Sequence, residues 1–285
     1  MNFPSATLLA QSALSGVFIG GLYGLLGLGL SLSWGLLHVI NLAHFGFAFL
    51  AAYLCYQLAS VGGMDPLLTL VLLVPLFAAL GVAVQWLLAR FSVSPLNSLL
   101  ATFGITAIIE AGIQAMWTAD FRKLESAYAG MKLRVGPLFV PVPELLTLAV
   151  AVVLSFAVFA TMRYTGIGRA LRALAEDAPV AAAFGINAKA HALLLSGVSA
   201  ALAAVAGVCL ALSFTLTPSS IYAWVGVVFA AVMLGGLGSA LGPLVAGIVI
   251  GLSEAVTMAF ASPSWAPIVS FTLLIALLLV RPERS

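Results

Sequence analysis

Two carboxylates lie inside apolar stretches of the sequence, where a charged side chain is costly. Glu110 and Glu254 are each flanked on both sides by runs of hydrophobic residues. A charged carboxylate at the centre of a bilayer costs about 2.5 to 3.5 kcal/mol on insertion scales. Each residue therefore either lines a polar pathway or is a neutral or hydrogen-bonded carboxyl that joins helices. The residue types leave both alternatives open.

A second polar group consists of His38, Asn41 and His44, which are spaced by three residues. This spacing allows all three side chains to share one face of a helix. No carboxylate or thiolate stands at ligand spacing beside them, so no metal site is expected. They either cap helix ends and join helices, or Asn41 and His44 shape a transport route.

The chain lacks the sequence signatures of a nucleotide-hydrolysing enzyme. The run Gly235–Gly238 is not a nucleotide-binding fingerprint, because no strand precedes it and its glycine spacing is wrong. None of the three lysines follows the glycines of a Walker sequence. An intramembrane hydrolase is a weak alternative, because Ser239 has no histidine near it in the sequence. We therefore expect no enzyme activity and no cofactor in this chain.

Composition identifies the kind of protein that must position these residues. Of 285 residues, 63% are hydrophobic and only 7% are charged, which nearly excludes a soluble fold. The net charge of +2 comes from scattered residues, which argues against nucleic-acid binding. Cys55 and Cys209 both lie in apolar segments and are interpreted as packing residues.

The apolar runs predict an all-α fold, a polytopic transmembrane helical bundle that forms a single domain over residues 1–285. About 20 apolar residues are needed to cross a membrane as a helix. The second of nine candidate spans is doubtful because polar residues between Trp34 and His44 interrupt the apolarity, so the count is eight to nine. The candidates are 8–33, 42–60, 67–89, 97–117, 144–162, 190–212, 222–240, 243–261 and 265–280.

Small residues recur at a spacing of four in several of these spans. Ser12, Gly16, Gly20 and Gly24 lie on one face of the first span, and the pairs Gly238/Gly242 and Gly247/Gly251 repeat the spacing. Such faces let helix backbones approach closely. They predict helix packing, although a subunit interface or a sliding surface would use the same pattern.

The distribution of basic residues predicts the orientation. If successive spans cross the membrane in alternating directions, seven basic residues lie on one side. They are Arg90, four residues in the segment 163–189 and two in the tail Arg281–Arg284. Four lie in the loop 118–143 on the other side. The positive-inside rule makes 163–189 cytoplasmic and 118–143 an extended periplasmic loop. The N-terminus is then outside with nine spans and inside with eight.

The cytoplasmic segment predicts two helices in succession. In the first, Gly168–Glu176, the basic residues Arg169 and Arg172 lie on a different face from the leucines. Asp177 is a suitable N-cap for a second helix over Ala178–Phe184, and Gly185 is a suitable terminator. The apolar face of this second helix would consist of Val180, Ala183 and Phe184.

A helix of about seven residues is unstable alone in water, because nucleation outweighs so few hydrogen bonds. The helix Ala178–Phe184 therefore needs a surface on which to dock. It either lies on the spans of its own chain at the membrane interface or inserts into a partner subunit.

Three separated motifs stand out in the chain: Gly168–Ala173 with Glu176-Asp177 and Phe184–Asn187, then Asn41–His44, and finally Leu234–Ser239 with Gly242. Together they resemble one family, the LivH-type permeases of bacterial ABC importers for branched-chain amino acids. The first motif resembles the coupling segment of that family, the second its signature after the first span, and the third its glycine-rich turn between late spans. The resemblance extends from the first span to Arg281-Pro282, with Phe45 standing where the family usually has glycine.

This resemblance implies a function, partners and site residues. The chain would be a permease subunit in the bacterial inner membrane, surrounded by lipid, with a LivM-like second permease or a second copy, a periplasmic solute-binding protein and two ATPase subunits that use the ATP. Aliphatic amino acids are the implied substrates, with urea or short amides as alternatives. The implied coupling residues are Arg169, Arg172, Glu176, Asp177, Val180, Ala183, Phe184 and Gly185, and the pathway candidates are Asn41, His44, Glu254, Gly235, Gly236 and Gly238.

A passive small-solute channel is the competing function. It would use the same apolar spans and glycines but would leave the segment 163–189 without a purpose. Copurification with an ATPase, and uptake that stops when ATP is depleted, distinguish the two functions.

Overall fold

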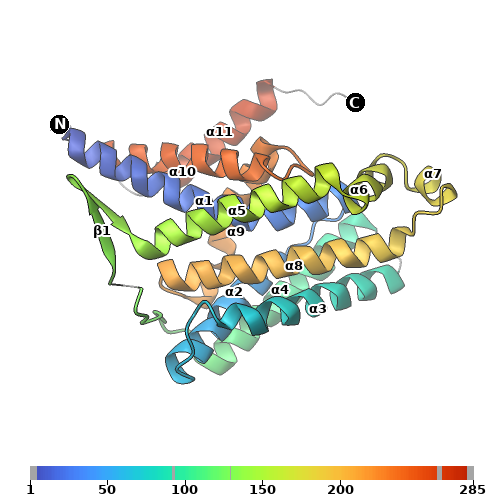
Figure 1. Cartoon of the computed structure of the whole chain (residues 1–285), viewed down its shortest axis with the longest axis horizontal. Helices are drawn as coiled ribbons and strands as arrows, with labels where there is room; N and C mark the ends of the chain where they lie inside the picture. Colours follow the sequence, from blue (N-terminus) through green and yellow to red (C-terminus); the bar gives the residue numbers. More distant parts are fainter. Residues whose placement is uncertain (1–4, 92–93, 129, 262–264, 281–285) are drawn as a thin grey trace.

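The computed structural model describes residues 5–91, 94–128, 130–261 and 265–280, which form a bundle of α-helices with one short β-hairpin (Figure 1). Two irregular helical turns extend the regular helices, a π-helical turn η1 after α2 and a 3-10 turn η2 before α9. The bounds are α1 Ala6–Leu37, α2 Ala43–Tyr56, η1 Gln57–Val61, α3 Thr69–Arg90, α4 Pro95–Trp117, β1 Lys132–Val135, β2 Leu138–Pro141, α5 Val142–Tyr164, α6 Gly166–Glu176, α7 Ala178–Ala183, α8 Ala188–Ser213, η2 Pro218–Ser220, α9 Ile221–Gly235, α10 Gly242–Phe260 and α11 Ala266–Val280.

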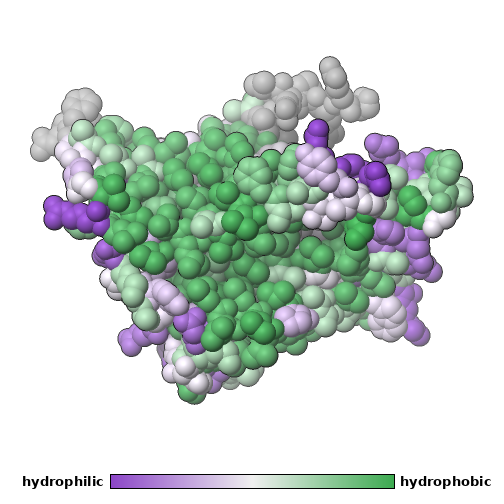
Figure 2. Space-filling view, in the orientation of Figure 1, coloured by the Kyte–Doolittle hydropathy of each residue, from purple (hydrophilic) through white to green (hydrophobic). Residues whose placement is uncertain are grey.

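Eight helices in the described ranges are long and apolar enough to cross a membrane, so the predicted polytopic bundle is confirmed. The doubtful second span is among them, as α2 continued by η1. The last expected span corresponds to α11, which has 15 residues and packs on α9 and α10. Figure 2 shows a hydrophobic surface across the middle of the molecule and hydrophilic residues at its two ends.

The helix α1 forms the centre of the bundle. It packs against α10, α8, α5 and α9, and nearly every residue from Gly20 to Ser33 is buried. The helix α8 is equally central, whereas most of α3, α4 and α5 faces outward. The core is therefore made of aliphatic and aromatic side chains from α1, α2 and α8.

The two ends of the bundle carry different elements of the chain. The side chain of Gln11, near the start of α1, makes two 2.9 Å hydrogen bonds with the backbone of Phe139 in the hairpin. The start of α1 and the hairpin therefore share one end, and α7 lies at the other (Figure 1). Five spans, α1 to α5, separate the N-terminus from α6. Because five is an odd number, the N-terminus and the segment 163–189 lie on opposite sides of the membrane. If that segment is cytoplasmic as predicted, the N-terminus is periplasmic.

The expected extended loop 118–143 carries the antiparallel pair β1–β2, in which Gly136 takes a positive φ of 60° at the turn. The loop is also tied to the turn before α3, because Tyr128 donates a 2.8 Å hydrogen bond to Asp65. This bond, together with the backbone N–H of Leu67, lowers the pKa of Asp65. The carboxylate is therefore charged at neutral pH, and its contribution to stability is lost only as the pH falls through that lowered pKa.

The link between α1 and α2 differs from the expectation for His38, Asn41 and His44. His38 has a positive φ of 56° and ends α1, so the three side chains do not share one helical face, and that prediction is wrong. His44 lies beside Leu26, which is eleven residues before the end of α1. At 1.5 Å per residue, α2 therefore begins about 16 Å deeper in the bundle than the point where α1 ends.

Candidate functional site

The helices α6 and α7 project from one end of the bundle (Figure 1). Asp177 separates them and caps α7, because its Oδ1 accepts the backbone N–H of Val180 at 3.0 Å. Gly185 takes a positive φ of 85° just after α7 and stops the helix. The predicted second short helix is confirmed with this cap and this terminator, although it ends at Ala183.

The projection is held firmly at its base. Leu171 of α6 and Ala181 of α7 are buried, and Arg172 donates a 2.7 Å hydrogen bond to the carbonyl of Met162 near the end of α5. A Cβ atom on Gly168 would overlap the backbone of Met162, so this glycine is what lets α6 cross α5 so closely. The contacts of α7 with α6, and of α6 with α5, therefore connect α7 to the end of α5.

The outer surface of α7 is apolar and unpartnered within the described chain. Val180 is 52% exposed, Phe184 is 84% exposed, and Ala183 is exposed beside them. We call these three residues the α7 surface. Their exposure disfavours the alternative in which the helix buries its apolar face on its own spans. The charged residues Arg169, Glu176 and Asp177 are also exposed around it.

His44 and Asn41 make contacts inside the bundle. The Nε2 atom of His44 lies 2.9 Å from the carbonyl oxygen of Leu26, and its Nδ1 atom lies 3.4 Å from the hydroxyl of Ser199 in α8. Asn41 accepts the backbone N–H of Ala43, the first residue of α2, at 3.1 Å in a local turn. The contacts of His44 join α2 to α1 and α8, and a pathway role for either residue remains a prediction.

The predicted helix over 222–240 is wrong at its end, because α9 stops at Gly235 and a turn follows. Gly236 and Gly238 take positive φ values of 89° and 75°, which a side chain would disfavour. The turn docks on α1, where Gly238 donates a 3.0 Å hydrogen bond to the carbonyl of Ser31. The tertiary contact at Ser31 was missed by sequence reasoning, and its signal was a serine within an apolar part of the first span.

Glu254 lies in the interior of the bundle and is 5% exposed. Tyr23 of α1 donates a 2.9 Å hydrogen bond to one carboxyl oxygen, and Ser270 of α11 donates to the other. Both oxygens therefore have hydroxyl donors from neighbouring helices. This geometry favours the helix-joining alternative, and the pathway role of Glu254 is untested.

We expect Glu254→Gln to keep uptake within about twofold of the unchanged chain, since an amide oxygen still accepts one hydroxyl. Glu254→Leu is the contrasting variant. It leaves two buried hydroxyls without an acceptor, at about 1–3 kcal/mol each, and lowers the amount of folded protein. Uptake and membrane-inserted protein are measured together. A large loss of uptake in Glu254→Gln at normal expression would assign Glu254 to the pathway.

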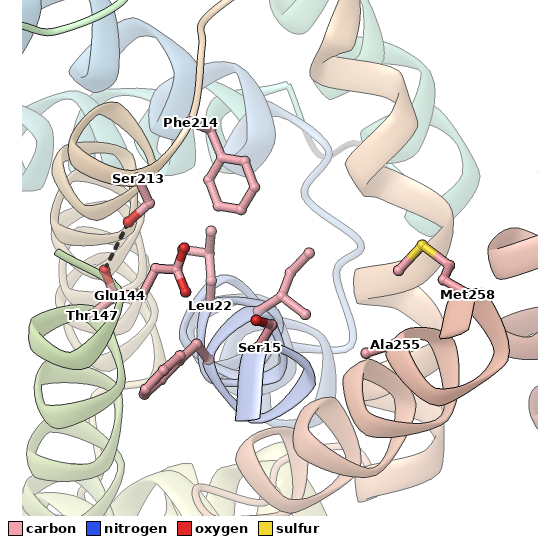
Figure 3. Close-up of a pocket in the computed structure, with 10 residues that line it drawn as sticks. Ser15, Leu22, Glu144, Thr147, Ser213, Phe214, Ala255 and Met258 are labelled. Carbon is pink, nitrogen blue, oxygen red and sulfur yellow. Dashed lines mark hydrogen bonds between the residues drawn. The ribbon is translucent and has the colours of Figure 1, made fainter. Parts of the chain in front are cut away.

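A hollow of about 190 Å³ opens among α1, α5, α8 and α10, toward the end of the bundle that carries the hairpin (Figure 3). Its walls are mostly apolar, with Phe18, Leu22 and Met258 among the lining residues. Its polar groups are the hydroxyl of Ser15, the carboxylate of Glu144 and the pair Thr147 and Ser213, whose hydroxyls are 3.4 Å apart. Sequence reasoning did not single out Glu144, whose one signal is an acidic residue in the first turn of a span.

Comparison with known families connects this geometry to transport. A family model described as branched-chain amino acid transport system / permease component matches residues 12–278. The chain belongs to this family. The family is a transport permease component, not an enzyme. The resemblance of this chain to LivH-type permeases is thereby confirmed. The resembling pair Arg281-Pro282 lies outside the described residues.

Individual relatives of this permease family agree along nearly the whole chain. The high-affinity branched-chain amino acid transport system permease protein LivH of Salmonella typhimurium is 29% identical over 95% of this chain and 93% of its own length. The corresponding BraD protein of Pseudomonas aeruginosa is 25% identical over 95% and 94%. A probable LivH protein of Methanocaldococcus jannaschii is 28% identical over 93% and 89%. No solved structure shows a significant match to the chain.

Proposed function

We propose that this chain is a membrane-spanning permease subunit of an ATP-driven importer of branched-chain amino acids, located in a bacterial inner membrane. The observation that carries the proposal is the α7 surface, which is apolar, exposed and rigidly mounted. Membership of the transport permease family and the names of the relatives support the same function and substrate class.

The energy source lies in other subunits. Two ATPase subunits bind the cytoplasmic end and receive the α7 surface, and ATP is consumed there. Burying one large apolar side chain contributes about 1.5–3 kcal/mol, so Phe184 alone accounts for a tenfold or larger part of the affinity. The coupling residues in this proposal are Arg169, Arg172, Glu176, Asp177, Val180, Ala183, Phe184 and Gly185.

The remaining partners follow from the direction of transport. A periplasmic solute-binding protein delivers the amino acid at the end that carries the hairpin, and a LivM-like permease or a second copy of this chain completes the pathway. The deep start of α2 and the turn after α9 are two helix breaks near which the solute passes. Asn41, His44, Gly235, Gly236 and Gly238 are the residues proposed to shape this route, while Glu254 is proposed to join α10 to α1 and α11.

Uptake of radiolabelled leucine by cells that contain the complete transporter tests the function. We expect uptake to stop when ATP is depleted, and the ATPase subunits to copurify with this chain. Urea and short amides, tested in competition, are expected not to reduce leucine uptake. Transport of leucine by the purified chain alone, with no nucleotide and no ATPase, would contradict the proposal and favour a passive channel.

A further inference from the structure

Glu110 is the intramembrane carboxylate that the bundle does not enclose. It lies on α4 seven residues before Trp117, which places it about 10 Å inside the outer end of that span. The buried face of α4 carries Ser98, Thr102, Thr106 and Ile113 and packs on α2. Glu110 is only partly buried and lies at the edge of this face, one helical turn from both Thr106 and Ile113.

The surroundings of Glu110 form a small polar patch at membrane depth. Gln114, one turn further along α4, donates a 3.1 Å hydrogen bond to one carboxyl oxygen, and the hydroxyl of Tyr222 in α9 lies beside the same side chain. Phe103 packs against the Tyr222 ring at a centroid distance of 6.0 Å. Tyr222 is 39% exposed and Phe103 is 47% exposed, so the aromatic pair is open to whatever covers this face.

Neither helix supplies a positive charge for this carboxylate. The sequences of α4 and α9 contain no Lys, Arg or His. A carboxylate has about four acceptor positions, and its two neighbours leave capacity for a further donor. An ionisable residue at this depth faces a water-filled cavity or a partner in nearly all membrane proteins, because lipid offers it no hydrogen bonds.

Glu254 and Glu110, the two intramembrane carboxylates, have different surroundings. Glu254 has both oxygens satisfied by hydroxyls of its own chain, whereas Glu110 is partly exposed beside the Tyr222 ring, on which Phe103 packs. Aromatic faces attract alkylammonium groups through the charge distribution of the ring. A carboxylate beside such a ring is therefore suited to an ammonium group that arrives from outside this chain.

We propose that the face of α4 and α9 around Glu110 lines the solute route, and that Glu110 accepts the ammonium group of the transported amino acid. This proposal rests on the proposed function and adds a specificity-determining residue to it. A basic side chain of the second permease subunit would supply the same chemistry, so the experiment must distinguish these two sources.

The test is the concentration dependence of ATP-driven leucine uptake by the complete transporter. Glu110→Gln is expected to raise the KM for leucine about tenfold or more while both permease subunits and the ATPases still copurify. Glu110→Asp keeps the carboxylate and is expected to restore most of the affinity. Glu125→Gln, the same change at an exposed residue of the outer loop, is the matched control and is expected to leave KM unchanged.

Three results would overturn the proposal. An unchanged KM in Glu110→Gln would show that the carboxylate does not meet the solute. Loss of the second permease subunit on copurification would assign the partner of Glu110 to that subunit. A lower maximal rate at constant KM, with no rescue by Asp, would indicate a structural role. If the unchanged transporter shows no ATP-dependent leucine uptake, the proposed function fails instead.

Discussion

Phe184→Asp is expected to reduce ATP-driven uptake at least tenfold while the chain still inserts and folds. The side chain is 84% exposed and packs on little of its own chain, so its replacement leaves the bundle intact. In the transporter the same side chain would be buried against an ATPase subunit. Losing that burial costs about 1.5–3 kcal/mol, and a buried unpaired carboxylate adds a desolvation penalty.

Phe121→Asp provides the matched control for this variant. Phe121 is 80% exposed and lies in the loop at the opposite end of the bundle. Copurification of the ATPase subunits and leucine uptake are measured for both variants. We expect the ATPases to be lost from Phe184→Asp alone. Normal ATPase association and normal uptake in Phe184→Asp would remove the docking role of α7.

The second large effect is expected for Gly20→Val, which should prevent α1 from packing on α10. A Cβ atom on Gly20 would lie 2.5 Å from the carbonyl oxygen of Gly247 and from the Cα of Ile248. Both are backbone atoms, so no side chain can rotate away, and one of the two helices must shift. Overpacking of this kind costs about 1–3 kcal/mol, and the rigid contact places this site at the upper end of that range.

Gly104→Val is the control, because nothing lies within 4 Å of the Cβ position at Gly104 of α4. The two variants share the same change in helix propensity. We expect the apparent melting temperature in detergent to fall for Gly20→Val and to stay nearly unchanged for Gly104→Val. Equal melting temperatures would show that α1 and α10 separate by that distance at little cost.

Local patterns determined most of the elements of this protein. Span length and apolarity follow directly from the thickness of the hydrocarbon core, so the spans were predictable one by one. The cap at Asp177 and the terminator at Gly185 were equally predictable, because both depend on residues only a few positions apart. The stripe of Gly16, Gly20 and Gly24 likewise identified a smooth helical face before any partner was known.

The pairing of these faces required the tertiary structure. The glycine stripe of α1 could have met another span or another subunit, and only the packing identified Gly247 and Gly251 of α10 as its partners. Likewise, Glu110 and Glu254 have the same residue type and similar sequence surroundings. They differ because only Glu254 has hydroxyl donors for both carboxyl oxygens. These donors are Tyr23, which is 231 residues from Glu254 in the sequence, and Ser270, which is 16 residues away.

By itself the sequence determined the membrane environment, the helical elements and the capped α7, since composition, span length and local capping act over a few residues. Only the tertiary structure decided that α2 starts deep beside Leu26, that Phe184 has no cover within the described chain, and that Glu110 is only partly enclosed. Such features depend on contacts between helices distant in sequence, and apolar spans of similar composition do not encode their neighbours in any local pattern.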